Sequence, residues 1–239
     1  MKYIKLTAVF LFLGLAALLF LRVTATPVLA QGIITADRFL AMVSERYAEI
    51  RDYEARVVIR SGTTDMTGNL SYLSPFFLRI DFTSPPGQVL VFNGSLLSIH
   101  IPDLRAVLTQ HVSPARRTAT PGGGAGLASA QGLQLLQRGY VATFVTGPEP
   151  VPLDGTGEMV VQLRLTRRLA AEGFREIILS INPNTMLIRR IEGRTIADAL
   201  VRFDFHDVRT NLGIPEQRFV FDPPGTANIF NNFMFQEAH

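Results

Sequence analysis

The sequence contains no cysteine and no tryptophan among its 239 residues. The absence of cysteine excludes a disulfide framework, a thiolate zinc or iron–sulfur site, a cysteine nucleophile, and a lipid anchor on an N-terminal cysteine of this chain. Charged residues are also few, at 18%, whereas hydrophobic residues make up 47%. This balance excludes an intrinsically disordered protein, and the length fits one domain or at most two.

Lysine is nearly absent, since Lys2 and Lys5 are the only two in the chain. Together with Arg22 they account for the whole formal net charge of +3. The rest of the chain carries 20 basic and 20 acidic residues and is therefore neutral. The basic isoelectric point thus gives no support to nucleic-acid binding, and we expect no nucleic-acid partner.

The first thirty residues have the pattern of an export signal. Lys2 and Lys5 precede an uncharged apolar run of 16 residues, Leu6 to Leu21. Val28-Leu29-Ala30 then places small residues at the recognition positions, which predicts cleavage after Ala30. A retained membrane anchor is the alternative, although a span needs about 20 apolar residues. We expect a signal peptide over residues 1–30, one domain over residues 31–239, and a periplasmic location.

The remainder is predicted to be one helix followed by a long antiparallel sheet. Thr35 is a plausible N-cap, and apolar residues recur at helical spacing from Phe39 through Ile50. Beyond this point the period changes to two, which is typical of half-buried strands. No strand–helix–strand alternation occurs, so a parallel nucleotide-binding sheet is not expected. About a dozen strands are predicted: Tyr53–Arg60, Met66–Tyr72, Phe76–Phe82, Val89–Phe92, Leu96–Ile101, Ala106–His111, Tyr140–Thr146, Met159–Arg168, Phe174–Ile181, Met186–Arg194, Leu200–Arg209 and Arg218–Phe221.

The clearest hairpin signal lies between Val89 and Ile101. Asn93-Gly94 separates two apolar runs, and this dipeptide supplies the positive φ angles that a tight hairpin turn requires. We therefore predict a turn centred on Asn93 and Gly94.

An insert interrupts the sheet pattern. The segment from Ser113 to Gly126 contains Arg116, Arg117 and several glycines and prolines, which predicts a flexible loop. The following stretch carries Leu127, Leu133, Leu135 and Leu136, almost without charge, and favours a helix of about three turns. We interpret this helix as a lid, and a helix that fills one end of a barrel is the alternative.

Signals for catalysis are missing. The four histidines, His100, His111, His206 and His239, show no metal-ligand spacing, and no nucleophile elbow or phosphate-binding loop is present. Asp204 and Asp207 face opposite ways on a strand, so they do not form a carboxylate pair. We expect no enzyme activity, no metal and no cofactor.

The apolar sheet face is the remaining functional signal. One helix and a short lid cover only part of it, so we expect the sheet to enclose a cavity. Such a cavity suits an acyl chain, because each buried methylene contributes about 0.8 kcal/mol and roughly sixteen carbons contribute up to ~12 kcal/mol. The predicted lining residues are Leu70, Tyr72, Leu78, Ile80, Phe82, Leu97, Ile99, Leu133, Leu136, Phe203 and Phe205. For each of them, an ordinary core position is the alternative.

Two motifs resemble a known family. The first motif consists of three consecutive segments. Ser74–Pro85 contains a proline, an aromatic strand and a Thr-Ser-Pro turn. An apolar strand with an Asn-Gly hairpin turn follows in Val89–Gly94, and Ile99–Pro102 is a strand that ends in proline. Phe219–Gly225 reads Phe-Val-Phe-Asp-Pro-Pro-Gly. The order of the two motifs, together with the signal peptide, the N-terminal helix and the chain length, resembles that of LolA, the family of outer-membrane lipoprotein carriers. Residues 113 to 153 match only in layout.

The resemblance implies a fold and a function. The fold would be mainly β (α+β): an unclosed antiparallel β-barrel of about 11 strands with an N-terminal helix and a short helical lid. The function would be that of a monomeric periplasmic carrier and chaperone, which receives acylated lipoproteins or lipids from an inner-membrane release complex and delivers them to an outer-membrane acceptor. Many carriers hold the lid with an arginine where this chain has Ser74, and Arg79 or the Arg116-Arg117 pair is a possible substitute. Ile80 and Ser98 replace the tryptophans of the family.

Three other functions stay open. The first is a carrier of the same fold whose cargo is a glycolipid or another free lipid. Related sheets also serve as periplasmic regulatory modules that sense stray lipoproteins, but those carry a further C-terminal domain. An uncharacterised hydrolase is the third. The apolar tail around Phe230, Phe233, Met234 and Phe235 either packs back on the sheet or contacts a partner or membrane.

Overall fold

The computed structural model describes residues 34–112, 123–168 and 174–233. The predicted signal peptide, the loop residues 113–122 with Arg116 and Arg117, and the tail beyond residue 233 lie outside the described residues.

The described chain folds into one 13-stranded sheet with two α-helices and several 3₁₀ turns. The helices are α2 (Ala36–Ala48) and α3 (Ala130–Gly139), and the turns are η1 (Pro102–Leu104), η3 (Gly123–Leu127) and η4 (Glu216–Phe219). The strands are β1 (Asp52–Ser61), β2 (Thr64–Leu73), β3 (Phe77–Ser84), β4 (Val89–Asn93), β5 (Leu96–Ile101), β6 (Ala106–His111), β7 (Tyr140–Phe144), β8 (Val151–Pro152), β9 (Met159–Arg167), β10 (Phe174–Ile181), β11 (Ile188–Thr195), β12 (Leu200–Thr210) and β13 (Asn228–Asn231).

The sheet is open and follows the chain order almost throughout. Its strands run β13-β6-β5-β4-β3-β2-β1-β12-β11-β10-β9-β7, with β8 paired to β9. The long β12 lies beside β1 and so joins the two halves of the sheet. Every pair is antiparallel except β13 and β6, which are parallel. The predicted mainly β class and the unclosed antiparallel sheet with a helical lid are confirmed, and β8 and β13 are the strands that the pattern did not predict.

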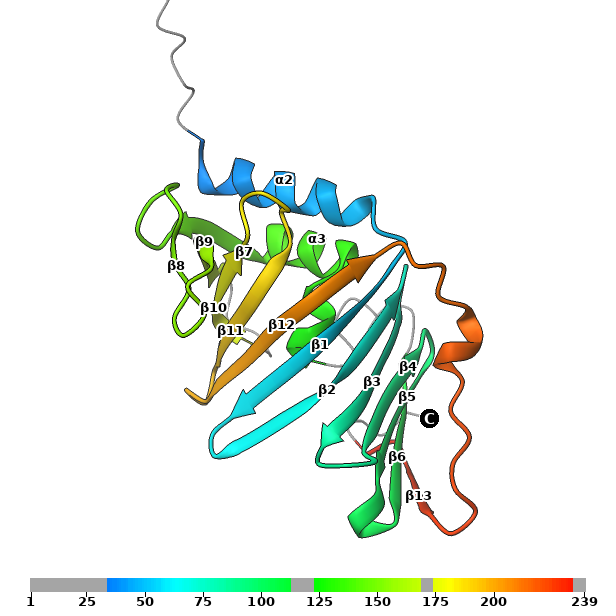
Figure 1. The fold of residues 1–239 in the computed structure, drawn as a ribbon. Helices are drawn as coiled ribbons and strands as arrows, with labels where there is room; N and C mark the ends of the chain where they lie inside the picture. The colour runs from blue at the N-terminus through cyan, green and yellow to red at the C-terminus, as the bar shows by residue number, and fades with distance from the viewer. Residues whose placement is uncertain (1–33, 113–122, 169–173, 234–239) are drawn as a thin grey trace, which may run out of the picture. The chain divides into compact units, whose positions relative to one another are not determined.

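Both helices lie on one face of this sheet (Figure 1). Helix α2 packs against β7 and α3, and its Tyr47 hydroxyl accepts a hydrogen bond from the Ile188 amide of β11; α3 packs against α2, β7 and η3. Thr35 caps α2 as predicted, with its Oγ1 accepting a hydrogen bond from the Arg38 amide at 3.2 Å. The helix ends at Ala48, two residues before the predicted end at Ile50.

The β4–β5 hairpin forms as predicted, but its turn lies one residue further along. Phe92 pairs with Leu97, which leaves Gly94 and Ser95 as the two turn residues. Gly94 has φ 90°, and a turn with glycine at its first central position needs only that one positive φ. Asn93 instead stabilises the turn with its side chain, whose Oδ1 accepts from the amides of Ser95 and Leu96.

The predicted strand Arg218–Phe221 is wrong. The chain forms η4 here, and the buried Phe219 ring lies 5.4 Å from that of Phe77. The Phe221 ring lies 5.8 Å from the ring of His100. The alternation of Phe219 and Phe221 therefore reflects two aromatic residues that pack onto an existing sheet face. The terminal strand is β13, where Ile229 and Phe230 remain about half exposed.

Candidate functional site

The strand registers place the predicted lining residues on one face of the sheet. Leu70 lies opposite Ile80, and Tyr72 lies opposite Leu78. Directly paired residues of antiparallel strands share a face, so these four point the same way. We call this side, which also carries Phe203 and packs against α2 and α3, the inner face, and the opposite side the outer face.

The structure brings all eleven predicted residues into one apolar cluster. Ten of them are buried core residues, and Ile99 is partly buried and packs against that core. Leu133 and Leu136 come from α3 and are 0% and 1% exposed. The two leucines therefore cover the inner face where we expect an acyl chain. Contact with a ligand stays a prediction for all eleven.

Burial on the inner face is uneven across the sheet. Leu163 and Leu179, at the end covered by α2, are fully buried. At the other end, Leu90, Ile99 and Leu108 form a cross-strand row over β4, β5 and β6 and are only half-buried. The apolar inner face thus continues beyond the part covered by the described helices.

Two tyrosine hydroxyls fasten the helical segment to the sheet. The buried Tyr53 hydroxyl, from β1, donates to the carbonyl oxygen of Ala128 at 2.9 Å. The Tyr72 hydroxyl, from β2, lies 2.9 Å from Oε1 of Gln131 and 3.1 Å from the carbonyl oxygen of Pro75. Its single proton serves one of these acceptors at a time. The rings of Tyr53 and Tyr72 lie 5.2 Å apart, so the two hydroxyls form one latch under α3.

Burial shifts the pKa of both tyrosines upward. Loss of hydration raises the pKa of Tyr72 to about 12 and that of Tyr53 well above its ordinary value. Both hydroxyls are consequently neutral and able to donate at any physiological pH. In the sequence, Tyr53 stands out only as a strand residue. The missed signal is that a tyrosine on a buried face needs a partner for its hydroxyl.

The 3₁₀ turn η3 and helix α3 pack as one unit. Ser129 caps α3, with its Oγ accepting from the Gly132 amide at 3.0 Å and donating to the Gly126 carbonyl at 2.7 Å. Gly132 faces η3 so closely that a Cβ atom there would lie 2.5 Å from the Gly126 oxygen and 2.6 Å from Cα of Leu127. The segment Gly123–Gly139 is called the lid below.

The suggestion that Arg79 holds the lid is wrong. Arg79 alternates with the inner-face residues Leu78 and Ile80, so its side chain lies on the outer face. There its guanidinium binds Asp81 and donates to the carbonyls of Arg218 and Val220 at 3.2 Å each. Burial raises the pKa of Asp81, but the hydrogen bonds and charges of Arg79 and Arg218 outweigh it and hold that pKa below the ordinary value. Arg79 therefore holds the η4 segment rather than the lid.

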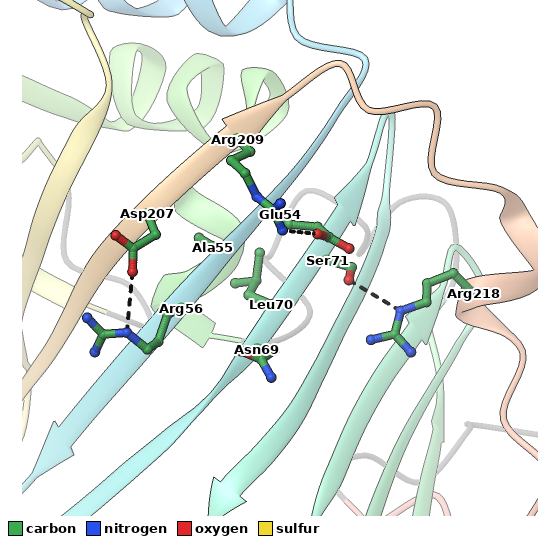
Figure 2. A pocket seen from close by; sticks show the side chains of 9 residues that line it. All are labelled: Glu54, Ala55, Arg56, Asn69, Leu70, Ser71, Asp207, Arg209 and Arg218. Atoms are coloured by element: carbon green, nitrogen blue, oxygen red, sulfur yellow. Dashed lines mark hydrogen bonds and ion pairs between the residues drawn. The ribbon is translucent and has the colours of Figure 1, made fainter.

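A hollow of about 480 Å³, lined mostly by polar and charged residues, lies on the outer face (Figure 2). Its floor comes from β1 and β2, and its sides come from β12 and from Arg218 of η4. The lining residues are Glu54, Ala55, Arg56, Asn69, Leu70, Ser71, Asp207, Arg209 and Arg218. No local sequence pattern predicts this hollow, because it joins residues that lie more than 130 positions apart in the chain.

Within residues 34–112, 123–168 and 174–233, no group of three His, Asp or Glu side chains is placed to hold a metal ion. In the same part of the chain, no helix is both long and apolar enough to cross a membrane.

Comparison with known proteins identifies the fold. No family model and no curated protein sequence matches the chain. An uncharacterised conserved protein from Thermus thermophilus matches with a TM-score of 0.52 and 12% identity, over 80% of this chain and 98% of that one. MucB matches with a TM-score of 0.51 and 14% identity, over 82% of this chain. The match spans 65% of MucB.

A LolA superfamily protein from Nitrosomonas europaea also matches, with a TM-score of 0.40 and 14% identity over 79% of this chain and 98% of that one. The matches to the Thermus thermophilus protein and to MucB show that the chain shares their fold, an open antiparallel-dominated sheet with a helical lid on its inner face. The fold expected from the sequence is therefore confirmed.

Proposed function

We propose that this protein is a non-enzymatic carrier of lipids or lipoproteins, and that acyl chains bind the inner face in place of the lid. The observation that carries the proposal is the way the inner face is covered. The lid, which includes the ten-residue helix α3, closes a continuous apolar surface, and two tyrosine hydroxyls fasten the lid to the sheet. The adjoining row of Leu90, Ile99 and Leu108 is only half-buried and offers a place where a chain can begin to bind.

The energetics favour long acyl chains over short ones. Exposing Leu133 and Leu136 costs about 1.5–3 kcal/mol each, and the two tyrosine hydrogen bonds contribute about 1 kcal/mol each. Displacing the lid therefore costs about 5–8 kcal/mol, which the burial of about six to ten methylenes offsets at about 0.8 kcal/mol each. An eight-carbon chain barely meets this cost, whereas a sixteen-carbon chain exceeds it.

The cellular role follows from the resemblance to the LolA family. We propose that the chain acts in the periplasm as a monomer, takes acylated lipoproteins from an inner-membrane release complex and delivers them to an outer-membrane acceptor. Mass spectrometry of the material that co-purifies with the chain distinguishes lipoproteins from glycolipids or other free lipids.

A titration with acyl ligands tests the proposal. We expect saturable binding of a sixteen-carbon fatty acid or a diacylated peptide to the purified chain, and no measurable binding of the eight-carbon acid. Ile99→Gln should weaken binding about tenfold, because it places a polar group on the inner face. Leu96→Gln is the matched control, since Leu96 is a half-buried residue of the same strand on the outer face. Equal effects of the two substitutions, or no saturable binding, would refute the proposal.

The fold match to MucB favours a second candidate, a periplasmic regulatory module that senses lipoproteins. A carrier contacts its donor and its acceptor only transiently and forms no stable protein complex when it binds its acyl ligand. A sensor forms or breaks a stable protein complex when the ligand binds. Size-exclusion chromatography of periplasmic extract with and without a diacylated peptide distinguishes the two.

A further inference from the structure

The outer-face hollow lies on the opposite side of the sheet from the surface that carries the proposed function, and Leu70 of β2 borders both. Figure 2 shows the side chains of Arg56, Asn69 and Ser71 on the sheet, with Arg218 reaching in from the η4 segment on one side. Arg209 and Asp207 come from β12 on the other side. Three separate parts of the chain thus each contribute an arginine to the lining of this hollow.

An irregularity in β12 shapes the hollow. The register between β1 and β12 shifts between Glu54 and Arg56, and Asp207 opposite this shift has φ 54°. Such a bulge re-aims the side chains beside it, and a positive φ is uncommon for a residue other than glycine. As a result, Asp207 and Arg209 both line the hollow, beside Arg56 and Glu54 of β1.

The arginines are held in place by partners that a ligand can displace. Arg56 lies 3.5 Å from Asp207, and the two side chains are 48% and 79% exposed. Arg209 lies 2.9 Å from Glu54, with 68% and 37% exposure. Exposed pairs of this kind contribute little to stability, so an incoming anion can replace these carboxylates at small cost. Arg218 is held more firmly, through Asp81 and a 3.4 Å contact with Ser71 Oγ.

The chemistry of the hollow favours a phosphate ester. A guanidinium presents a rigid fork of N–H donors that matches the oxygens of phosphate, and Asn69 and Ser71 add neutral donors on the floor. A volume of about 480 Å³ is in the range of small-molecule sites and leaves room for more than the phosphate itself. We propose that this hollow is a binding site for a phosphate monoester or diester of glycerophosphate size, either a free metabolite or the head group of a membrane phospholipid. The site is independent of acyl binding on the inner face.

Calorimetry with sn-glycerol 3-phosphate tests the site on the purified full chain. We expect saturable binding that weakens at least tenfold in the double variant Arg56→Gln/Arg209→Gln. The matched control is Arg38→Gln/Arg175→Gln, which removes two exposed arginines elsewhere and should leave affinity unchanged. Asp207→Asn should strengthen binding about threefold, because it removes the carboxylate that competes for Arg56. Circular dichroism checks that each variant is folded.

A second experiment distinguishes a free phosphate ester from the head group of a membrane phospholipid. Sedimentation with phosphatidylglycerol vesicles, compared with phosphatidylcholine vesicles, tests a lipid head group. Vesicle binding that is lost in Arg56→Gln/Arg209→Gln supports a head group, and binding of glycerol 3-phosphate without vesicle binding supports a free ester. Absence of both, an equal loss in the control variant, or weaker binding in Asp207→Asn would overturn the proposal.

Discussion

The tyrosine latch leads to the sharpest prediction, the effect of Tyr53→Phe on the lid. The substitution keeps the ring and its packing and removes only the hydroxyl that donates to the buried Ala128 carbonyl. A buried carbonyl without a partner costs about 1–3 kcal/mol, which corresponds to about a 5- to 150-fold change in an equilibrium. Because this carbonyl belongs to the lid, we expect the open population of the lid to rise by that factor.

Hydrogen exchange measured by mass spectrometry detects the change. The Leu133 amide donates to the Ser129 carbonyl at 2.9 Å and the Gly132 amide to Ser129 Oγ, so both report lid opening. Their exchange should accelerate in Tyr53→Phe, while strands β9–β11 exchange as before. Affinity for a sixteen-carbon acyl chain should rise together with the open fraction, because only the open form is competent to bind.

Tyr47→Phe provides the control. The Tyr47 hydroxyl is equally buried but accepts from the Ile188 amide at 3.1 Å and so fastens α2 to the sheet. Its loss should destabilise the protein without selective exchange in the lid. If lid exchange in Tyr53→Phe equals that of the unsubstituted chain, or rises just as much in Tyr47→Phe, the latch does not act on the lid.

Three other predictions follow from the same packing. Gly132→Ala should raise lid exchange, because a Cβ there meets the η3 backbone and overpacking costs about 1–3 kcal/mol, whereas Gly139→Ala in the same helix meets nothing within 4 Å and should leave exchange unchanged. The free energy of unfolding, measured with denaturant at increasing pH, should stay the same up to about pH 10 and fall toward pH 12. The tyrosines of the unfolded chain lose their protons near pH 10, whereas Tyr53 and Tyr72 keep theirs in the folded chain. An unfolding free energy that does not fall by pH 12 would contradict the raised pKa values. Phe219→Ala should lower the free energy of unfolding by about 3–5 kcal/mol without weakening acyl binding, since its ring packs on the outer face; a loss of acyl binding at full stability would contradict that placement.

Period-two alternation explains why much of this fold was predictable. The side-chain period of a strand decides which residues share a face, and this rule is local in sequence. It was enough to place residues as distant as Leu70 and Phe203 on the same face and in one core. The lid helix was also predictable from local sequence, because several leucines gather in a stretch that carries almost no charge.

Contacts between distant segments could not be predicted in this way. The Tyr53 hydroxyl meets the carbonyl of Ala128, 75 residues away, and nothing local marks that carbonyl as its acceptor. Likewise, Phe219 alternates as a strand residue does, although its burial comes from stacking on Phe77. The hollow depends on a bulge at Asp207, which the alternating pattern of β12 conceals.

A single tryptophan in the lid tests most directly whether acyl chains replace α3 on the inner face. The chain has no tryptophan of its own, so Leu135→Trp, at a half-buried position of α3, gives one unambiguous fluorescence signal. Titration with a sixteen-carbon acyl ligand should shift the emission to longer wavelength and increase quenching by iodide, both saturating with the binding curve. Saturable binding with no change in emission would mean that the lid stays in place and that the acyl chain binds elsewhere.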